Sequence, residues 1–285
     1  MAFTFQTKPP RDLPAKAKVY SLLAPKLSTA TMKATARSMG LEWGDLDLLT
    51  STDRMGAVGG RWQIEIQRAS GALQAMHIDK YGFDSGEPFK LTDRRAQTLA
   101  GKFLAQSKLV PVDSARVLKV THLRGADGDV SGEKVTERVL DAGVLYGRLV
   151  DAIPVIGPGG LAMVHLDGRG DLVGVRTIWR TLGRSAGTVK IRPVEWAVAG
   201  LQEATSSALG DVSVLKAEFG YFELGVLDRQ QVLEPVYAFV YTVRNKDIAS
   251  KHVHVVHAGD NAYGKLSGRR RFPSGSQRAR LAPKA

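Results

Sequence analysis

The chain has 285 residues, of which 44% are hydrophobic and 24% charged, enough apolar material for one large or two medium folded domains. It contains no cysteine, which excludes disulfides, thiol nucleophiles and zinc–thiolate sites. No apolar run reaches the roughly 18 residues of a transmembrane helix, and the first residues lack the apolar core of a signal peptide, so we expect neither.

The basic residues are concentrated at the two ends of the chain. The net charge is +12; residues 1–40 hold seven lysines and arginines with one aspartate, and residues 261–285 hold seven with no acid. The ends therefore carry +6 and +7, which leaves about −1 for the residues between them. A neutral body with basic ends indicates contacts with anionic partners through the ends and argues against a nucleic-acid-reading fold.

The start of the chain predicts a basic, proline-rich extended arm over residues 1–28. Residues 29–88 predict a short first unit, a helix followed by a hairpin. Its helical spacing is carried by Met32, Ala36 and Met39, and its strand alternation by Trp62, Ile64 and Ile66 before the turn at Ser70-Gly71.

Two further units repeat this plan over residues 89–190 and 191–260. In the second unit Thr92 is the expected N-cap of a helix, and Pro111 ends it. Its helical stripe is Ala96, Leu99, Ala100, Phe103 and Leu104, and four strands follow at 115–123, 137–150, 161–167 and 171–179. In the third unit a helix begins near Pro193, and strands follow at 211–224, 233–245 and 250–259.

The predicted fold class is therefore α+β: repeated units in which one helix covers an antiparallel meander, with basic extended termini. The Gly- and Ser-containing run "GRSAG" (183–187) is interpreted as the linker between the second and third units. It also matches GxSxG around Ser185, but a nucleophile elbow requires a helix to begin at the serine, and none is expected there.

The run "YGRLVDAIPVIGPGGLAMVHLDGRGDLVGV" (146–175) predicts a hairpin made by two linked turns. Pro154 lacks an N–H donor and suits a strand edge or a bend, while Gly157 and Gly160 permit a sharp reversal. Asp167 and Gly170 predict a second tight turn in which the aspartate accepts bonds from nearby backbone amides. Strand alternation then places Leu161, Met163 and His165 on one face, and Ala162, Val164 and Leu166 on the other.

This hairpin resembles one in the propeptide domains of thermolysin- and fungalysin-type metalloproteases, which are related to PepSY domains. The resemblance rests mainly on Tyr146, Ile153-Pro154-Val155, Gly157, Leu161, His165, Asp167, Gly170 and Val173. It implies a PepSY- or cystatin-like fold over roughly residues 90–260, an extracytoplasmic location, and a role as inhibitor or chaperone of a protease. No HExxH motif occurs and the residues after 260 are too few for a protease, so such a domain would act on a separate protein.

The run His252, His254 and His257 is the strongest metal motif in the sequence. On a strand, His252 and His254 point to one face, a spacing that zinc sites use, but His257 points to the other and no third ligand is nearby. We therefore interpret these residues as ordinary edge-strand histidines and expect no metal and no cofactor.

The C-terminal residues 261–285 predict a disordered basic tail. Its candidate binding residues are Arg269, Arg270, Arg271, Phe272, Arg278 and Arg280. With no convincing catalytic constellation, the sequence favours a non-catalytic protein-binding or assembly module that docks onto an acidic protein or forms an oligomer. The alternative is a nucleic-acid-associated structural protein, in which the same basic ends contact phosphates.

Overall fold

The computed structural model describes residues 2–41, 47–83, 87–128, 135–208, 210–245 and 248–266. Among the described residues, strands account for 49% and helices for 16%, and most of the strands belong to one large mixed sheet. The predicted α+β fold of repeated helix-on-meander units is therefore wrong. Most of the expected helices and strands are present, but the strands of the three expected units pair with one another and share a single sheet.

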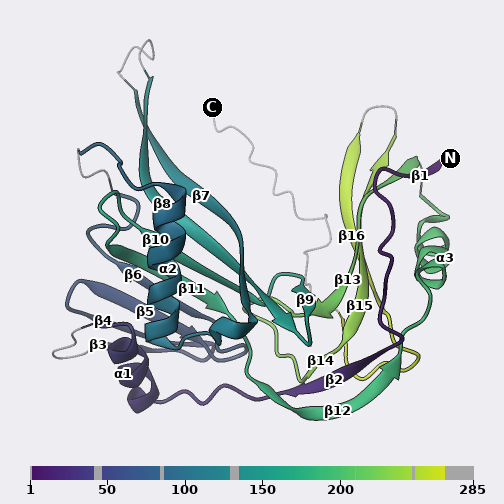
Figure 1. The fold of residues 1–285 in the computed structure, drawn as a ribbon, viewed down its shortest axis with the longest axis horizontal. Helices are drawn as coiled ribbons and strands as arrows, with labels where there is room; N and C mark the ends of the chain where they lie inside the picture. Colours follow the sequence, from purple (N-terminus) through teal and green to yellow (C-terminus); the bar gives the residue numbers. More distant parts are fainter. Residues whose placement is uncertain are drawn as a thin grey trace, which may run out of the picture.

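The first lobe lies on the left in Figure 1 and contains two helices on one face of an antiparallel sheet. Helix α1 is Thr29–Ser38 and helix α2 is Asp93–Ser107. The strands are β3 Asp47–Thr50, β4 Arg54–Gly59, β5 Trp62–Gln67, β6 Leu73–His77, β7 Ala115–Gly128, β8 Val135–Val150, β10 Leu161–Leu166 and β11 Leu172–Ile178. A 3₁₀ turn, Val112–Ser114, precedes β7.

Helix α2 begins where the sequence predicts. The Thr92 hydroxyl accepts a bond from the N–H of Arg95 at 3.4 Å and caps α2, and Ser28 caps α1 in the same way. The predicted stripe of α2 is buried at Ala96, Ala100 and Leu104, which pack on the sheet. On the sheet side, Ala162, Val164 and Leu166 are at most 2% exposed, which confirms the alternation expected for β10.

The pairing of β6 with β11 joins the first and second expected units. Within this lobe the strands run in the order β8, β10, β11, β6, β5, β4, β3, with β7 on the other side of β8. Val175 of β11 lies opposite Ala75 of β6, so two strands that no local rule connects are neighbours in space. An isolated meander would leave these edges unpaired, and pairing them satisfies their backbone groups.

The second lobe lies on the right in Figure 1 and contains the end of the same sheet. Its strands are β13 Asp211–Phe222, β15 Pro235–Arg244 and β16 Ala249–His257, and helix α3, Val194–Thr205, covers one face. The core beneath α3 contains Ala197 and Leu201 of the helix with Val214, Tyr237 and Phe239 of the strands.

A short strand connects the two lobes. β9 (Ile153–Ile156), which contains Pro154, pairs antiparallel with β8 and parallel with β13. A second, three-stranded sheet crosses below it and consists of β12 Leu182–Lys190, β2 Lys16–Leu22 and β14 Val232–Leu233.

The "GRSAG" run is a strand rather than the predicted linker, because β12 pairs with β2 over most of its length. The described part of the expected N-terminal arm is also built into the fold. β1 (Phe3–Phe5) pairs with β13 and β2 lies at the centre of the small sheet. No helix in the described ranges is long and apolar enough to cross a membrane.

Candidate functional site

The face of the first-lobe sheet opposite α1 and α2, called the outer face here, carries a row of side chains that crosses five strands. In register, Leu145 of β8 lies opposite Met163 of β10, which lies opposite Arg176 of β11. The row continues to Gln74 of β6 and Glu65 of β5. Strand alternation places all five on the outer face, since their neighbours along each strand are buried beneath the helices.

A groove of about 190 Å³ lies on this face at the end nearer the second lobe. Leu145, Leu161, Met163, Ile178 and Val226 line its apolar part. Arg176, Glu65, Gln67 and Gln74 form its polar end. The groove therefore combines an apolar floor with a few polar groups, as ligand and peptide sites commonly do.

The two charges at the polar end of the groove differ in their partners. Glu65 is engaged, since Arg54 Nη1 lies 2.9 Å from its Oε2 and the Gln67 amide donates to its Oε1 at 2.6 Å. Arg176 is exposed and makes no hydrogen bond or ion pair with another residue in the described ranges. The groove therefore presents one uncompensated positive charge beside apolar side chains.

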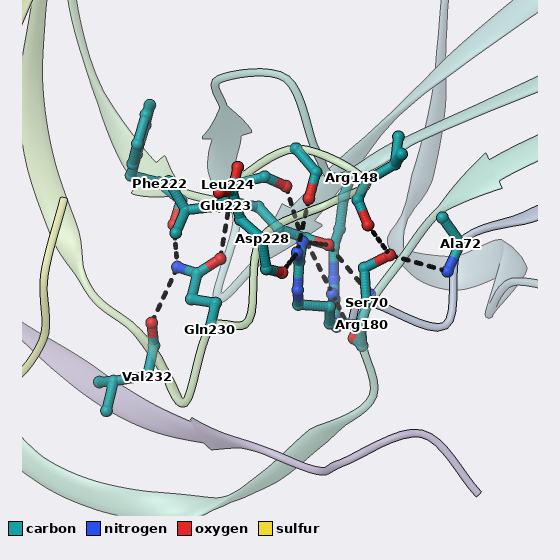
Figure 2. Close-up of polar contacts among 12 residues, drawn as sticks. Ser70, Ala72, Arg148, Arg180, Phe222, Glu223, Leu224, Asp228, Gln230 and Val232 are labelled. Carbon is teal, nitrogen blue, oxygen red and sulfur yellow. Dashed lines mark hydrogen bonds and ion pairs between the residues drawn. The ribbon is translucent and has the colours of Figure 1, made fainter. Parts of the chain in front are cut away.

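The loop between β13 and β14 forms one wall of the groove. Figure 2 shows this loop and the side chains that hold it. The Ser70 hydroxyl donates to the carbonyl of Val226 at 2.7 Å and accepts a bond from Ala72 N–H, which ties the loop to the turn between β5 and β6. On the other side, the Gln230 amide bonds the backbone of Phe222, Leu224 and Val232.

Arg180 is the central support of this wall (Figure 2). Its guanidinium donates to the carbonyls of Leu224, Gly225 and Asp228 at 2.7, 2.8 and 2.7 Å. One guanidinium thus fixes three backbone carbonyls of one loop in a geometry that a lysine, with a single nitrogen, would not reproduce.

Arg180 belongs to a buried ionic cluster with Arg148 and Glu223 (Figure 2). Arg180 is 3% exposed, Arg148 is 4% exposed and Glu223 is fully buried. Glu223 Oε2 lies 3.3 Å from Arg148 Nη1, and its Oε1 lies 3.3 Å from Arg180 Nη1 and accepts the Arg180 N–H at 3.0 Å. Arg148 Nη1 also donates to the Arg180 carbonyl at 2.7 Å, and its guanidinium lies 5.3 Å from the ring centre of Trp179.

Burial sets the pKa shifts of this cluster. It lowers the pKa of both guanidiniums and raises that of the Glu223 carboxyl, since a charged group loses solvation inside the protein. Each shift is opposed by the oppositely charged partner, and for Glu223 also by the backbone N–H of Arg180. The cluster connects β8, the segment after β11 and the end of β13, and so fixes the groove wall to both lobes.

The predicted hairpin residues lie on and around this site. Gly157 and Gly160 have φ of +99° and +69°, as the predicted reversal requires. The Asp167 carboxylate accepts bonds from Arg169 N–H and Asp171 N–H at 3.0 and 2.9 Å, and Gly170 has φ of +94°, which confirms the second turn. Tyr146 lies beneath α2 and donates to the Gln97 carbonyl, and Pro154 is in β9.

His165 lies on the outer face, beyond the other end of the groove. Its Nδ1 is 3.1 Å from Asp141 Oδ1, and the Tyr81 ring packs edge-on at 5.0 Å between ring centres. Such a carboxylate–imidazole pair resembles the base half of a catalytic triad. Its Nε2 is buried and bonds no hydroxyl in the described part of the chain, so these residues do not complete a triad there.

The remaining predicted residues do not join the groove. His252 and His254 lie on β16, the last strand of the sheet, in the second lobe. No group of three or more histidine, aspartate or glutamate side chains with metal-site geometry occurs among the residues that the structure describes. The tail residues Arg269, Arg270, Arg271, Phe272, Arg278 and Arg280 lie outside the described ranges.

Arg148, Arg180 and Glu223 were not among the predicted site residues. A signal for them was present, because each is a single charge inside an apolar run: "LYGRLV", "TIWRTL" and "GYFELG". Charged residues are almost never fully buried unless they are paired, so three such residues in strand-like runs indicate partners for one another. Arg176 and the groove had no comparable local signal.

Comparisons with known proteins give the fold alone. No protein-family model and no curated protein matches the chain. Among solved structures, an uncharacterized protein from Eubacterium rectale is similar, with a TM-score of 0.53 and 13% identity, over 86% of this chain and 85% of that one. At this identity the similarity shows a shared fold, and the resemblance of residues 146–175 to protease propeptides stays a prediction from sequence.

Proposed function

We propose that the protein is a non-catalytic protein-binding module whose groove receives a segment of another protein. The segment would place an apolar side chain against Leu145, Met163 and Ile178 and an acidic group beside Arg176. The observation that carries this proposal is the uncompensated positive charge of Arg176 at the edge of an apolar groove. Aspartate or glutamate on the partner would supply the missing charge.

The supported wall favours binding. Ser70, Arg180 and Gln230 hold the loop that contains Val226 through bonds to its backbone, so little conformational entropy is lost when a partner contacts it. A preformed groove binds more tightly than a mobile one with the same contacts.

Site-specific photo-crosslinking in the cell of origin tests this proposal. A photoreactive amino acid in place of Met163 should give one discrete adduct, which mass spectrometry identifies. The adduct should fall at least tenfold when Arg176→Glu is added, because the partner's acidic group then meets a like charge. The matched control replaces Thr98, which is exposed on α2 on the opposite face of the sheet.

Two results would contradict the proposal. One is the absence of any adduct from Met163 under conditions in which the protein is folded and abundant. The other is the same adduct, at the same yield, from Met163 and Thr98, since the contact would then be unrelated to the groove.

A finer form of the proposal follows from the propeptide resemblance, in which the partner is a metalloprotease. It predicts that the purified protein slows substrate turnover by a thermolysin-like enzyme and that Arg176→Glu weakens this inhibition. Unchanged turnover at saturating protein would remove this form and leave the more general one standing.

A further inference from the structure

β16 is the edge strand of the large sheet in the second lobe. It pairs with β15 from Ala249 to His257, and no described residue pairs with its other edge. Val253, at the centre of the strand, is 60% exposed. An exposed strand edge with an apolar centre offers backbone donors and acceptors to another strand.

His252 and His254 project from the same face of this edge. His252 is opposite Tyr241 of β15 and stacks on its ring, with 5.2 Å between the ring centres. The Ser250 hydroxyl lies 2.7 Å from His252 Nε2, which leaves Nδ1 for another ligand. His254 is opposite Phe239 and partly buried, two residues along the strand from His252.

We propose that β16 pairs antiparallel with β16 of a second copy of the chain, around a twofold axis at Val253, and that the two strands together bind one zinc ion. In this register His252 faces the partner subunit's His254, and His254 faces the partner subunit's His252. Residues directly opposite in an antiparallel pair have Cβ atoms about 4.5–5.5 Å apart, and diagonal ones about 7–8 Å, so the four imidazoles can gather around one ion.

The number of ligands indicates a second copy as the occupant of the edge. Protein zinc sites use three or four protein ligands, whereas one chain places only two histidines on this face. A twofold axis doubles the pair to four nitrogens, the number in a closed tetrahedral site. His257 lies on the other face, 3.1 Å from Glu234 Oε2, and takes no part.

The charges of the strand also permit self-pairing. Lys251 is the only lysine, arginine or acid between Ala249 and His257, and in the proposed register it faces the partner subunit's Val255. No two like charges are therefore opposite each other. Pairing nine residues through one edge buries less area than the roughly 1,200–2,000 Å² of a stable interface, so we expect the dimer to require the metal.

The test is the mass of the full chain in solution, measured by size-exclusion chromatography with light scattering, with EDTA or with zinc. We expect a monomer in EDTA and a dimer with zinc, at one zinc per two chains in a competition titration against a chromophoric chelator. The double variant His252→Ala/His254→Ala should stay monomeric with zinc, while His257→Gln on the same strand should still dimerise. Circular dichroism and thermal melting verify that each variant is folded.

A further variant separates strand pairing from metal binding. Val253→Arg keeps both histidines but places like charges opposite each other on the axis, so dimerisation should weaken at least tenfold. If the natural chain stays monomeric at saturating zinc, the proposal is overturned. Zinc-dependent association that survives the double histidine variant, or a stoichiometry of one zinc per chain, would overturn it as well.

Discussion

The Glu223 carboxylate accepts a hydrogen bond from the backbone N–H of Arg180 at 3.0 Å, although the two residues are 43 positions apart. The Arg180 guanidinium in turn bonds the carbonyls of the loop that begins directly after Glu223. The two residues therefore hold the ends of β11 and β13 together at the wall of the groove. Because both residues are buried, water cannot solvate the charge that remains when its partner is removed.

Glu223→Gln should strongly destabilise the protein. The amide keeps the shape of the side chain but leaves two buried guanidiniums without a counter-charge, which costs about 3–5 kcal/mol of unfolding free energy. Urea denaturation measures this loss. The matched control is Glu218→Gln on the same strand, whose pair with Lys216 is solvent-exposed, and it should cost about 1 kcal/mol or less. Equal effects of the two changes would mean that the buried cluster contributes no more than a surface ion pair.

Arg180→Ala should release the groove wall. Three loop carbonyls lose their donor, so the backbone amides of residues 224–229 should exchange with solvent at least tenfold faster. Hydrogen–deuterium exchange with mass spectrometry measures this change. Arg184→Ala, in an exposed part of β12, is the control and should leave the loop unchanged. Unaltered protection of the loop in the Arg180 variant would show that Ser70 and Gln230 suffice to hold it.

Two glycine substitutions should change the unfolding free energy in opposite directions. Gly160 has φ of +69°, and a Cβ atom there would lie 2.5 Å from Val155 Cγ1, so Gly160→Ala should cost about 1–3 kcal/mol. Gly200 is inside α3, and a Cβ atom there would meet nothing within 4 Å. Gly200→Ala should therefore raise the unfolding free energy by about 0.5–1 kcal/mol. Denaturant midpoints measure both, and a stabilising Gly160→Ala would contradict the strained turn.

Stability should fall at alkaline pH through the ionisation of Tyr20 and Tyr237. Burial raises the pKa of Tyr20 to about 12, helped by its hydrogen bond to Asp151 at 2.6 Å, and burial also raises the pKa of Tyr237 to about 12. In the unfolded chain these groups titrate near pH 10. The neutral form is thus favoured in the fold, and this contribution to stability is complete below about pH 10 and is lost as the pH rises to about 12.

Urea midpoints between pH 8 and 12, with tyrosinate absorbance near 295 nm, measure this decline. Tyr20→Phe removes one of the ionisations, so its stability should decrease less steeply with pH than that of the natural sequence. The change of stability with pH is compared, and not the stability at one pH, because the variant also loses the bond to Asp151. Parallel curves for the two proteins would show that Tyr20 does not contribute to the alkaline transition.

Local patterns predicted most elements but not their assembly. The cap of α2, its stripe and the turns of the hairpin depend on residues within a few positions of one another, and the structure confirms them. The predicted fold class was wrong, since nothing local indicates that β6 pairs with β11 or that β9 pairs with β13. Strand β12 was missed because Gly183, Ser185 and Gly187 are typical of a linker. Strand β2 was missed because it lies in the basic, proline-rich stretch that was expected to be an extended arm.

The groove and the buried ionic cluster also divide into features that the sequence predicts and features that it does not. Alternation along β10 places Met163 on the face opposite Ala162 and Val164, and the sequence alone establishes this. The placement of Arg176 beside Met163, and of Glu223 between Arg148 and Arg180, required strands from distant parts of the chain to meet. Periodicity along a helix or strand is a property of neighbouring residues, so sequence determines it. Strand order and the burial of paired charges are set by long-range backbone pairing and shared desolvation, which only the tertiary structure decides.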